Sequence, residues 1–169
     1  MEQLFALEVS KCVDKEIYKR TKSQKPRDYI GGSQIGVECC RKIQGHVDGV
    51  IMGGPKVMDY PCIVEFKSAK SSRFTKFLRD GLMQTDSNYY SQVQFYQRNM
   101  QLNNPALFCV MNKDDQSIYY ELIQYNPAHA DRLINKSEDI LNAIDSNHLM
   151  PRAYQDKNNW NCKYCDYRK

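Results

Sequence analysis

Long apolar runs are absent from this chain of 169 residues. No stretch approaches the roughly 20 consecutive apolar residues that span a bilayer, and the N-terminus, MEQLFALEVSKCVDKE, lacks the basic and then apolar order of a secretory signal. Internal repeats and low-complexity tracts are absent as well. We therefore expect a soluble, cytoplasmic protein with no membrane partner, and the length suits one buried core.

A strong excess of either charge is also missing. The chain has 24 basic and 20 acidic residues, for a net charge of +4. This excess is compatible with a polyanionic partner but is far below that of a histone-like tail. Twelve tyrosines, six phenylalanines and one tryptophan supply rings for stacking on bases, although most aromatic residues in a domain of this size belong to the core. Composition alone does not identify nucleic acid as the ligand.

Seven cysteines are present, an odd number in a chain without an export signal. This argues for thiols or metal ligands over a disulfide framework. Cys39 and Cys40 are adjacent, and Cys162 and Cys165 form a C-x-x-C near the end of the sequence. A C-x-x-C alone fits half of a zinc site or two thiols equally well, and thiolates at two ends of a chain suit either zinc or an iron–sulfur cluster.

The hydrophobic pattern predicts alternating helices and strand pairs. Two strand pairs are expected, over residues 45–67 and 106–125, because short apolar segments flank turn-rich sequence there. Helical periodicity is found over residues 2–20, over 87–102 and from Pro127 onward, and Ser33 could cap a short helix that contains Cys39, Cys40 and Arg41. This order predicts a mixed β-sheet flanked by helices, an α/β fold.

The first strand pair, GHVDGVIMGGPKVMDYPCIVEFK, carries three charged residues of interest. Asp48 lies in its first segment, and Glu65 and Lys67 lie two residues apart in its second. Because side chains alternate along a strand, Glu65 and Lys67 share one face while Val64 and Phe66 share the other. Acidic oxygens of this kind can hold Mg²⁺ or Mn²⁺ for phosphodiester hydrolysis, a lysine can orient water or phosphate, and the backbone carbonyl of Phe66 can add a ligand.

A basic series follows the second segment, at Lys70, Arg73, Lys76 and Arg79. Its spacing of three suits a solvated helix face or a mobile loop. Its position beside the acidic strand pair also fits a track for phosphates.

An acid followed by E-x-K is a common pattern in a chain of which 26% is charged, so a solvated strand face explains it equally well. Here a Q-x-x-x-Y helix, Gln92 to Tyr96, follows about 25 residues later in the correct order. Together, G-x-x-D-G (45–49), E-x-K (65–67) and Q-x-x-x-Y (92–96) resemble the PD-(D/E)XK nuclease superfamily. The closest resemblance is to its RecB-like exonuclease branch, which includes the CRISPR-associated four-cysteine nucleases and related phage enzymes.

The resemblance implies a restriction-endonuclease-like core and a role for each motif residue. Asp48 and Glu65 would be metal ligands, Lys67 the catalytic lysine, and Gln92 and Tyr96 would position the lysine or the DNA backbone. The alternative for the last two is an ordinary helix face. His46 precedes Asp48 by two residues and is either a ligand, a substrate contact or a packed neighbour of the site.

The resemblance also assigns the cysteines to an iron–sulfur cluster that clamps the two ends of a single 1–169 nuclease domain together. Cys39 would come from the first segment (about 33–42) and Cys162 and Cys165 from the last (about 160–169), with zinc as the alternative metal and Cys40 as a candidate fourth ligand. The family carries a helical stretch between its first cysteine and G-x-x-D-G, but here only four residues separate Cys40 from Gly45. The chain is therefore either a shortened member or lacks residues there or after Lys169.

From the motifs and the resemblance together we expect a divalent-metal-dependent DNA exonuclease acting on single-stranded DNA or duplex ends. It would work in recombination, repair or phage DNA processing, in a bacterial cell or a phage-infected host. Two alternatives stay open: a nucleic-acid-binding module on the same fold without catalysis, and an endonuclease or nickase.

Overall fold

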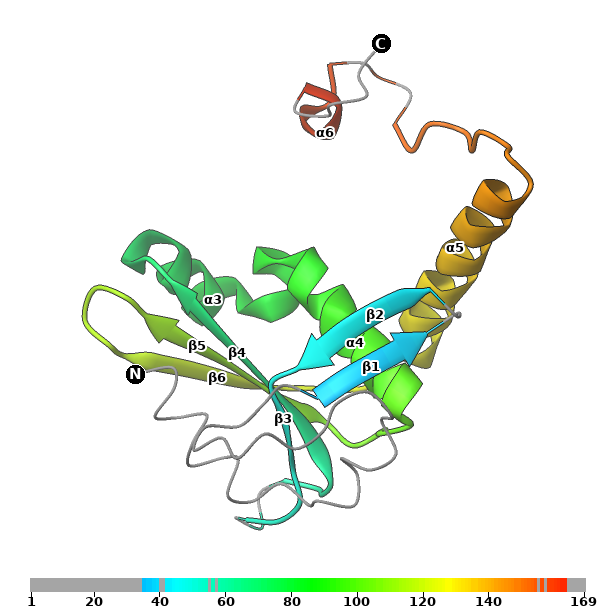
Figure 1. The fold of residues 1–169 in the computed structure, drawn as a ribbon. Helices are drawn as coiled ribbons and strands as arrows, with labels where there is room; N and C mark the ends of the chain where they lie inside the picture. Colours follow the sequence, from blue (N-terminus) through cyan, green and yellow to red (C-terminus); the bar gives the residue numbers. More distant parts are fainter. Residues whose placement is uncertain are drawn as a thin grey trace, which may run out of the picture. The chain divides into compact units, whose positions relative to one another are not determined.

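A computed structural model describes residues 35–39, 42–54, 56, 58–154, 156 and 158–163 of the chain. The chain forms two compact units, Met1–Asn135 and Lys136–Lys169. The first unit contains both sheets and the predicted active-site residues (Figure 1). The helix predicted over residues 2–20 lies outside the described residues.

The first unit is built on a four-stranded mixed sheet in the order β3-β4-β5-β6. Its strands are β3 (Gly49–Ile51), β4 (Cys62–Ala69), β5 (Ala106–Asn112) and β6 (Ile118–Ile123). Strands β4 and β5 are parallel, and the other neighbours are antiparallel. The predicted mixed sheet flanked by helices is confirmed, and both predicted strand pairs form, with β3 shorter than expected.

A second sheet of two antiparallel strands, β1 (Ile35–Cys39) and β2 (Ile43–Val47), precedes the main sheet. The prediction of a short helix through Cys39 is wrong. Every second residue of β1 is buried, and Glu38 between them is exposed. This period of two is that of a strand with one buried face, and it outweighs the capping potential of Ser33.

Two helices connect the parallel strands, and they are α3 (Ser71–Thr85) and α4 (Ser87–Met100). Phe77 of α3 and Tyr89 of α4 both contact the ring of Phe108 on β5, with centroid distances of 5.9 and 6.3 Å. Phe108 on β5 pairs with Glu65 on β4, so the side chains of these two residues lie on the same face of the sheet. Both helices therefore cover the face of the sheet that carries Glu65.

Helix α3 is kinked at Gly81, which has φ 72° and ψ 176°. Only glycine adopts this backbone conformation readily, because a Cβ atom clashes with the backbone there. The carboxylate of Glu121 on β6 accepts a hydrogen bond from the backbone N–H of Leu82 at 2.7 Å and another from the Tyr119 hydroxyl at 2.6 Å. Glu121 thereby pairs with a free backbone N–H group after the kink and attaches the helix to the sheet.

Helices α4 and α5 begin at conventional caps. Asp86 accepts hydrogen bonds from the backbone N–H groups of Asn88 and Tyr89, both at 3.1 Å. Helix α5 (Pro127–Asp145) has proline at its first position and a cap from Asn126, which confirms the helix predicted from Pro127. The helix predicted over 87–102 is confirmed as α4.

The second unit contains the last part of α5 and the short helix α6 (Trp160–Lys163). No helix in the described part of the chain combines the length and apolar character needed to cross a membrane. The single 1–169 domain with clamped ends stays a prediction, since Cys40 and Cys165 lie outside the described residues.

The kink predicts a specific effect of adding a Cβ atom. Gly81→Ala should lower the free energy of unfolding by about 1–3 kcal/mol, because alanine has to adopt the glycine-only conformation. Urea denaturation followed by circular dichroism measures this. Gly53→Ala is the matched control, since its added Cβ atom meets nothing within 4 Å. Equal stability of the two variants would contradict the strain at Gly81.

Candidate active site

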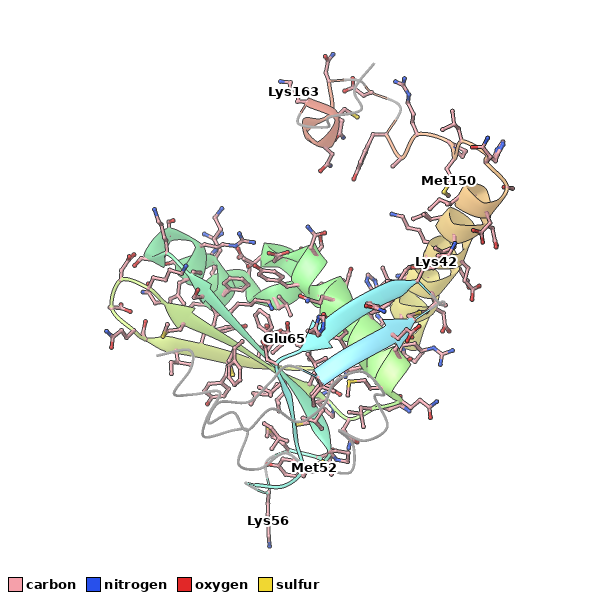
Figure 2. The ribbon with its side chains drawn as sticks, viewed as in Figure 1. Lys42, Met52, Lys56, Glu65, Met150 and Lys163 are labelled. Carbon is pink, nitrogen blue, oxygen red and sulfur yellow. The ribbon has the colours of Figure 1, made fainter. Side chains whose placement is uncertain are left out.

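Glu65 and Lys67 lie on the face of β4 that α3 and α4 cover. Glu65 is only 1% exposed, and Figure 2 places it where β4, α4 and β2 come together, whereas Lys56 projects outward from the loop between β3 and β4. Lys67 Nζ donates a hydrogen bond to Glu65 Oε1 at 2.5 Å. The predicted shared face is confirmed, and the two residues form a largely buried ion pair.

Burial raises the pKa of the Glu65 carboxyl from 4.5 to about 7, and the nearby charge of Asp48 adds to this, while Lys67 opposes it. Burial by itself lowers the pKa of Lys67, but the Glu65 carboxylate outweighs it and the net shift is upward. Lys67 is therefore cationic at neutral pH, whereas Glu65 titrates close to neutral pH. A pKa near 7 makes the site responsive to any cation that favours the carboxylate.

Asp48 lies at the bend between β2 and β3, where the chain passes from one sheet to the other. Strand β3 pairs with β4 only as far as Val64, opposite Gly49. Beyond that point Asp48 Oδ2 accepts a hydrogen bond from the backbone N–H of Phe66 at 2.7 Å. The N–H and C=O of one strand residue point to the same edge, so the Phe66 carbonyl, the predicted ligand, faces the edge that Asp48 occupies.

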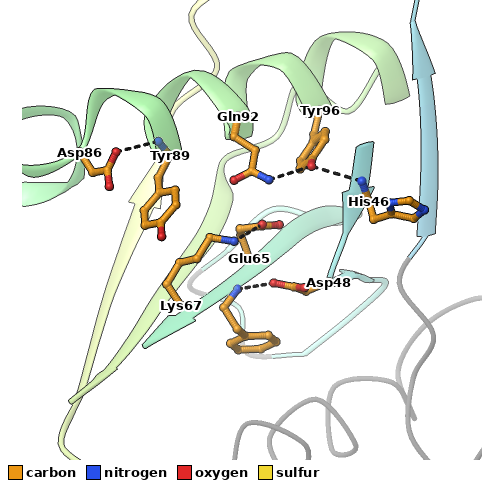
Figure 3. Close-up of polar contacts among 9 residues, drawn as sticks. His46, Asp48, Glu65, Lys67, Asp86, Tyr89, Gln92 and Tyr96 are labelled. Carbon is orange, nitrogen blue, oxygen red and sulfur yellow. Dashed lines mark hydrogen bonds and ion pairs between the residues drawn. The ribbon is translucent and has the colours of Figure 1, made fainter. Parts of the chain in front are cut away.

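Tyr96 connects α4 to β2 above the carboxylates. Its hydroxyl oxygen accepts hydrogen bonds from Gln92 Nε2 at 2.8 Å and from the backbone N–H of His46 at 3.3 Å (Figure 3). Two accepted bonds leave the phenolic proton to be donated. The structure thus brings Gln92 and Tyr96 together beside Glu65, as the motif order predicts.

The backbone of His46, not its imidazole, takes part in these contacts. Figure 3 shows the ring directed away from Glu65 and Asp48, and the residue is exposed. A ligand role for His46 stays a prediction that the present side-chain orientation does not favour.

Gly45, the first glycine of G-x-x-D-G, is required at the site for packing. A Cβ atom at this position would lie 2.7 Å from Tyr96 Cε1 and 3.0 Å from its hydroxyl oxygen. Tyr96 is 4% exposed and has little room to move. The glycine lets the tyrosine lie against β2, a packing reason that the motif alone does not state.

The donor set suits one hard divalent cation. Mg²⁺ is typically held by one or two carboxylates together with water and substrate phosphate, and Asp48 and Glu65 supply the carboxylates. Glu65 Oε2 is buried and has no hydrogen-bond partner among the described residues, which is costly for a carboxylate oxygen unless a ligand satisfies it. Among the same residues, no group of three His, Cys, Asp or Glu side chains could hold a metal ion. The residues fit a metal completed by water and phosphate better than a protein-only cage.

The cysteines occupy different environments. Cys39 is buried on β1, and Cys162 is partly buried on α6 in the second unit. Burial raises the pKa of Cys62, and that of Cys109 on β5 to about 12, so neither is a reactive thiol at neutral pH. The iron–sulfur or zinc site of Cys39, Cys162 and Cys165 stays a prediction.

Lys67 is bordered on its other side by Arg73, which belongs to the predicted basic series, and by Tyr89, which the motifs did not single out. Lys67 Nζ lies 5.1 Å from the centroid of the Tyr89 ring, and Arg73 Cζ lies 5.7 Å from it. Asp86 forms an ion pair with Arg73 Nη2. The available signal was that Tyr89 shares a helix face with Tyr96 and precedes Gln92 by three residues.

No family model and no curated protein matches the chain. Among solved structures, the crystal structure of SSO0001 is similar, with 18% sequence identity and a TM-score of 0.40 over 79% of this chain and 54% of that one. The chain thus spans about half of that protein's length. A similarity of this extent carries no functional argument.

The close approach at Gly45 predicts a packing defect on substitution. Gly45→Ala should lower the free energy of unfolding by about 1–3 kcal/mol through overpacking against Tyr96. Combining it with Tyr96→Leu, which removes the ring in the way, should cost less than the sum of the two single changes. Urea unfolding of the three variants gives the coupling, and strictly additive losses would rule the contact out as the cause.

The raised pKa of Glu65 predicts how stability depends on pH in metal-free protein. Between pH 4.5 and about 7 the folded state keeps a proton at Glu65 that the unfolded chain has released, so this group's contribution to stability falls as the pH rises. The wild type should therefore lose on the order of 2 kcal/mol relative to Glu65→Gln between about pH 5 and about pH 8. Unfolding in EDTA at both pH values measures the difference.

Proposed function

We propose that this protein is a divalent-metal-dependent nuclease that hydrolyses phosphodiester bonds of DNA, in the manner of an exonuclease. The observation that carries the proposal is the buried Glu65 carboxylate, with one oxygen bound to Lys67 and the other without a partner among the described residues. Asp48 lies at the adjoining strand edge. Two carboxylates and a lysine, drawn from two segments of the chain, thus meet at one place, which an ordinary solvated strand face does not explain.

Each residue has a distinct role in this proposal. Asp48 and Glu65 would hold Mg²⁺ or Mn²⁺, which when bound activates water and neutralises charge on the phosphate. Lys67 is fixed by Glu65 Oε1, so its ammonium is held in place to hydrogen-bond the attacking water or the scissile phosphate. Gln92 keeps the Tyr96 hydroxyl oriented, and the phenolic proton serves as a donor beside the carboxylates.

Conservative substitutions test these assignments. Asp48→Asn, Glu65→Gln and Lys67→Met should each lower the rate of DNA hydrolysis by about 100-fold or more, because each removes a charge that the reaction needs. Asp59→Asn, at an exposed position in the loop before β4, is the control and should keep full activity. The assay follows end-labelled single-stranded and duplex DNA in Mg²⁺ and in Mn²⁺. Folded variants with wild-type activity would remove the site assignment.

A circular single strand separates the proposed mode of action from its alternatives. An exonuclease needs an end and should leave the circle intact while it degrades the linear form. Cleavage of the circle would indicate an endonuclease. Binding of linear DNA without shortening in either metal would indicate a nucleic-acid-binding module on the same fold.

A further inference from the structure

A second cation lies next to the proposed catalytic lysine. Lys67 Nζ and Arg73 Cζ approach the same aromatic ring, that of Tyr89, with distances of 5.1 and 5.7 Å to its centroid. Both distances fall in the range in which a ring attracts a cation. Tyr89 is itself held by the core, where its ring packs against Phe108.

Arg73 is fixed in position but open to solvent. Asp86 pairs with its Nη2 atom, and the same carboxylate caps α4 through the backbone N–H of Tyr89. The Asp86 side chain is 9% exposed, whereas that of Arg73 is 51% exposed. A guanidinium has five N–H donors in a rigid fork, so one ion pair leaves donors for a phosphate.

We propose that Arg73 and Tyr89 form a phosphate subsite of the nuclease, in which Arg73 binds the backbone phosphate next to the scissile one. The subsite rests on the proposed function, and it extends the bound region from Lys67 along the start of α3. Because both cations lie within 5.7 Å of one ring centroid, both are available to phosphates of one strand bound at Tyr89. Tyr89 acts as a positioning residue that holds both cations at its ring.

Arg79 provides a matched control on the same helix. It is also paired with an acid, Asp80, at 2.7 Å, and its side chain is 69% exposed. It has no ring contact with Tyr89 among those described. Arg73→Gln and Arg79→Gln remove the same charge from α3, so a difference between them reports the local site and not the overall charge.

The salt dependence of DNA binding measures the phosphate contact directly. Binding of a single-stranded oligonucleotide is followed in EDTA between about 50 and 200 mM salt, where each phosphate contact contributes a slope of about 0.7 in log K against log salt concentration. Arg73→Gln should reduce the slope by about that amount, and Arg79→Gln should leave it unchanged. Equal slopes for the two variants would overturn the subsite.

Variants of Tyr89 test the positioning role. Tyr89→Phe keeps the ring and should keep both the slope and the KM for DNA. Tyr89→Leu should reduce the slope like Arg73→Gln and raise KM several-fold, and the double variant Arg73→Gln with Tyr89→Leu should lose little more. Additive losses, or a loss in Tyr89→Phe equal to that in Tyr89→Leu, would overturn this role. If Tyr89→Leu unfolds by circular dichroism, the exposed Arg73 variant still decides the phosphate contact.

Failure of the subsite can be told from failure of the proposed function. Binding with the expected slope change, but no shortening of DNA in Mg²⁺ or Mn²⁺, supports the subsite and rejects the nuclease. Cleavage with equal slopes supports the nuclease and rejects the subsite. A wild-type protein that binds no DNA at the lowest salt overturns both.

Discussion

Glu65 and Lys67 lie on the central strands' helix-covered face, in the midst of aromatic and aliphatic side chains, and the surrounding structure depends on their pairing. A buried charge without a partner is costly, so each of these two charges offsets part of the cost of burying the other. Their ion pair leaves Glu65 Oε2 without a partner among the described residues, and the Lys67 ammonium approaches the Tyr89 ring. This face of the sheet, which is otherwise apolar, therefore contains a buried ion pair.

Other carboxylates in the first unit accept hydrogen bonds from backbone N–H groups at points where a strand or helix ends or is interrupted. Asp48 takes the N–H of Phe66 beyond the end of β3, Asp86 takes two N–H groups at the start of α4, and Glu121 takes the N–H of Leu82 after the α3 kink. Such groups are rarely left unsatisfied in a folded chain. Asp48 and Asp86 each adjoin the candidate site as well, so the junctions that interrupt the fold also shape the chemistry.

Much of this arrangement is predictable from sequence, and the reasons for the failures are physical. The strand alternation at Glu65 and Lys67, the Q-x-x-x-Y helix and the second strand pair follow from local periodicity. The strand at Cys39 was mistaken for a helix because a polar residue that can cap was given more weight than a short alternation. The Gly45 contact with Tyr96 and the Arg73 contact with Tyr89 join residues distant along the chain. No local pattern contains such contacts.

The bend at Asp48 has a mechanical consequence. This residue is the covalent link between the β1–β2 sheet and the main sheet, while Glu65 belongs to the main sheet alone. A displacement of the small sheet relative to β4 would have to break the hydrogen bond between the Phe66 N–H and Asp48 Oδ2 before it changed the separation of the two carboxylates. In the proposed function, occupancy of the cation site and the position of the small sheet would therefore be thermodynamically linked, and the linkage would be reciprocal. A ligand bound to β1 and β2 would then change the metal affinity of that proposed site without contacting either carboxylate.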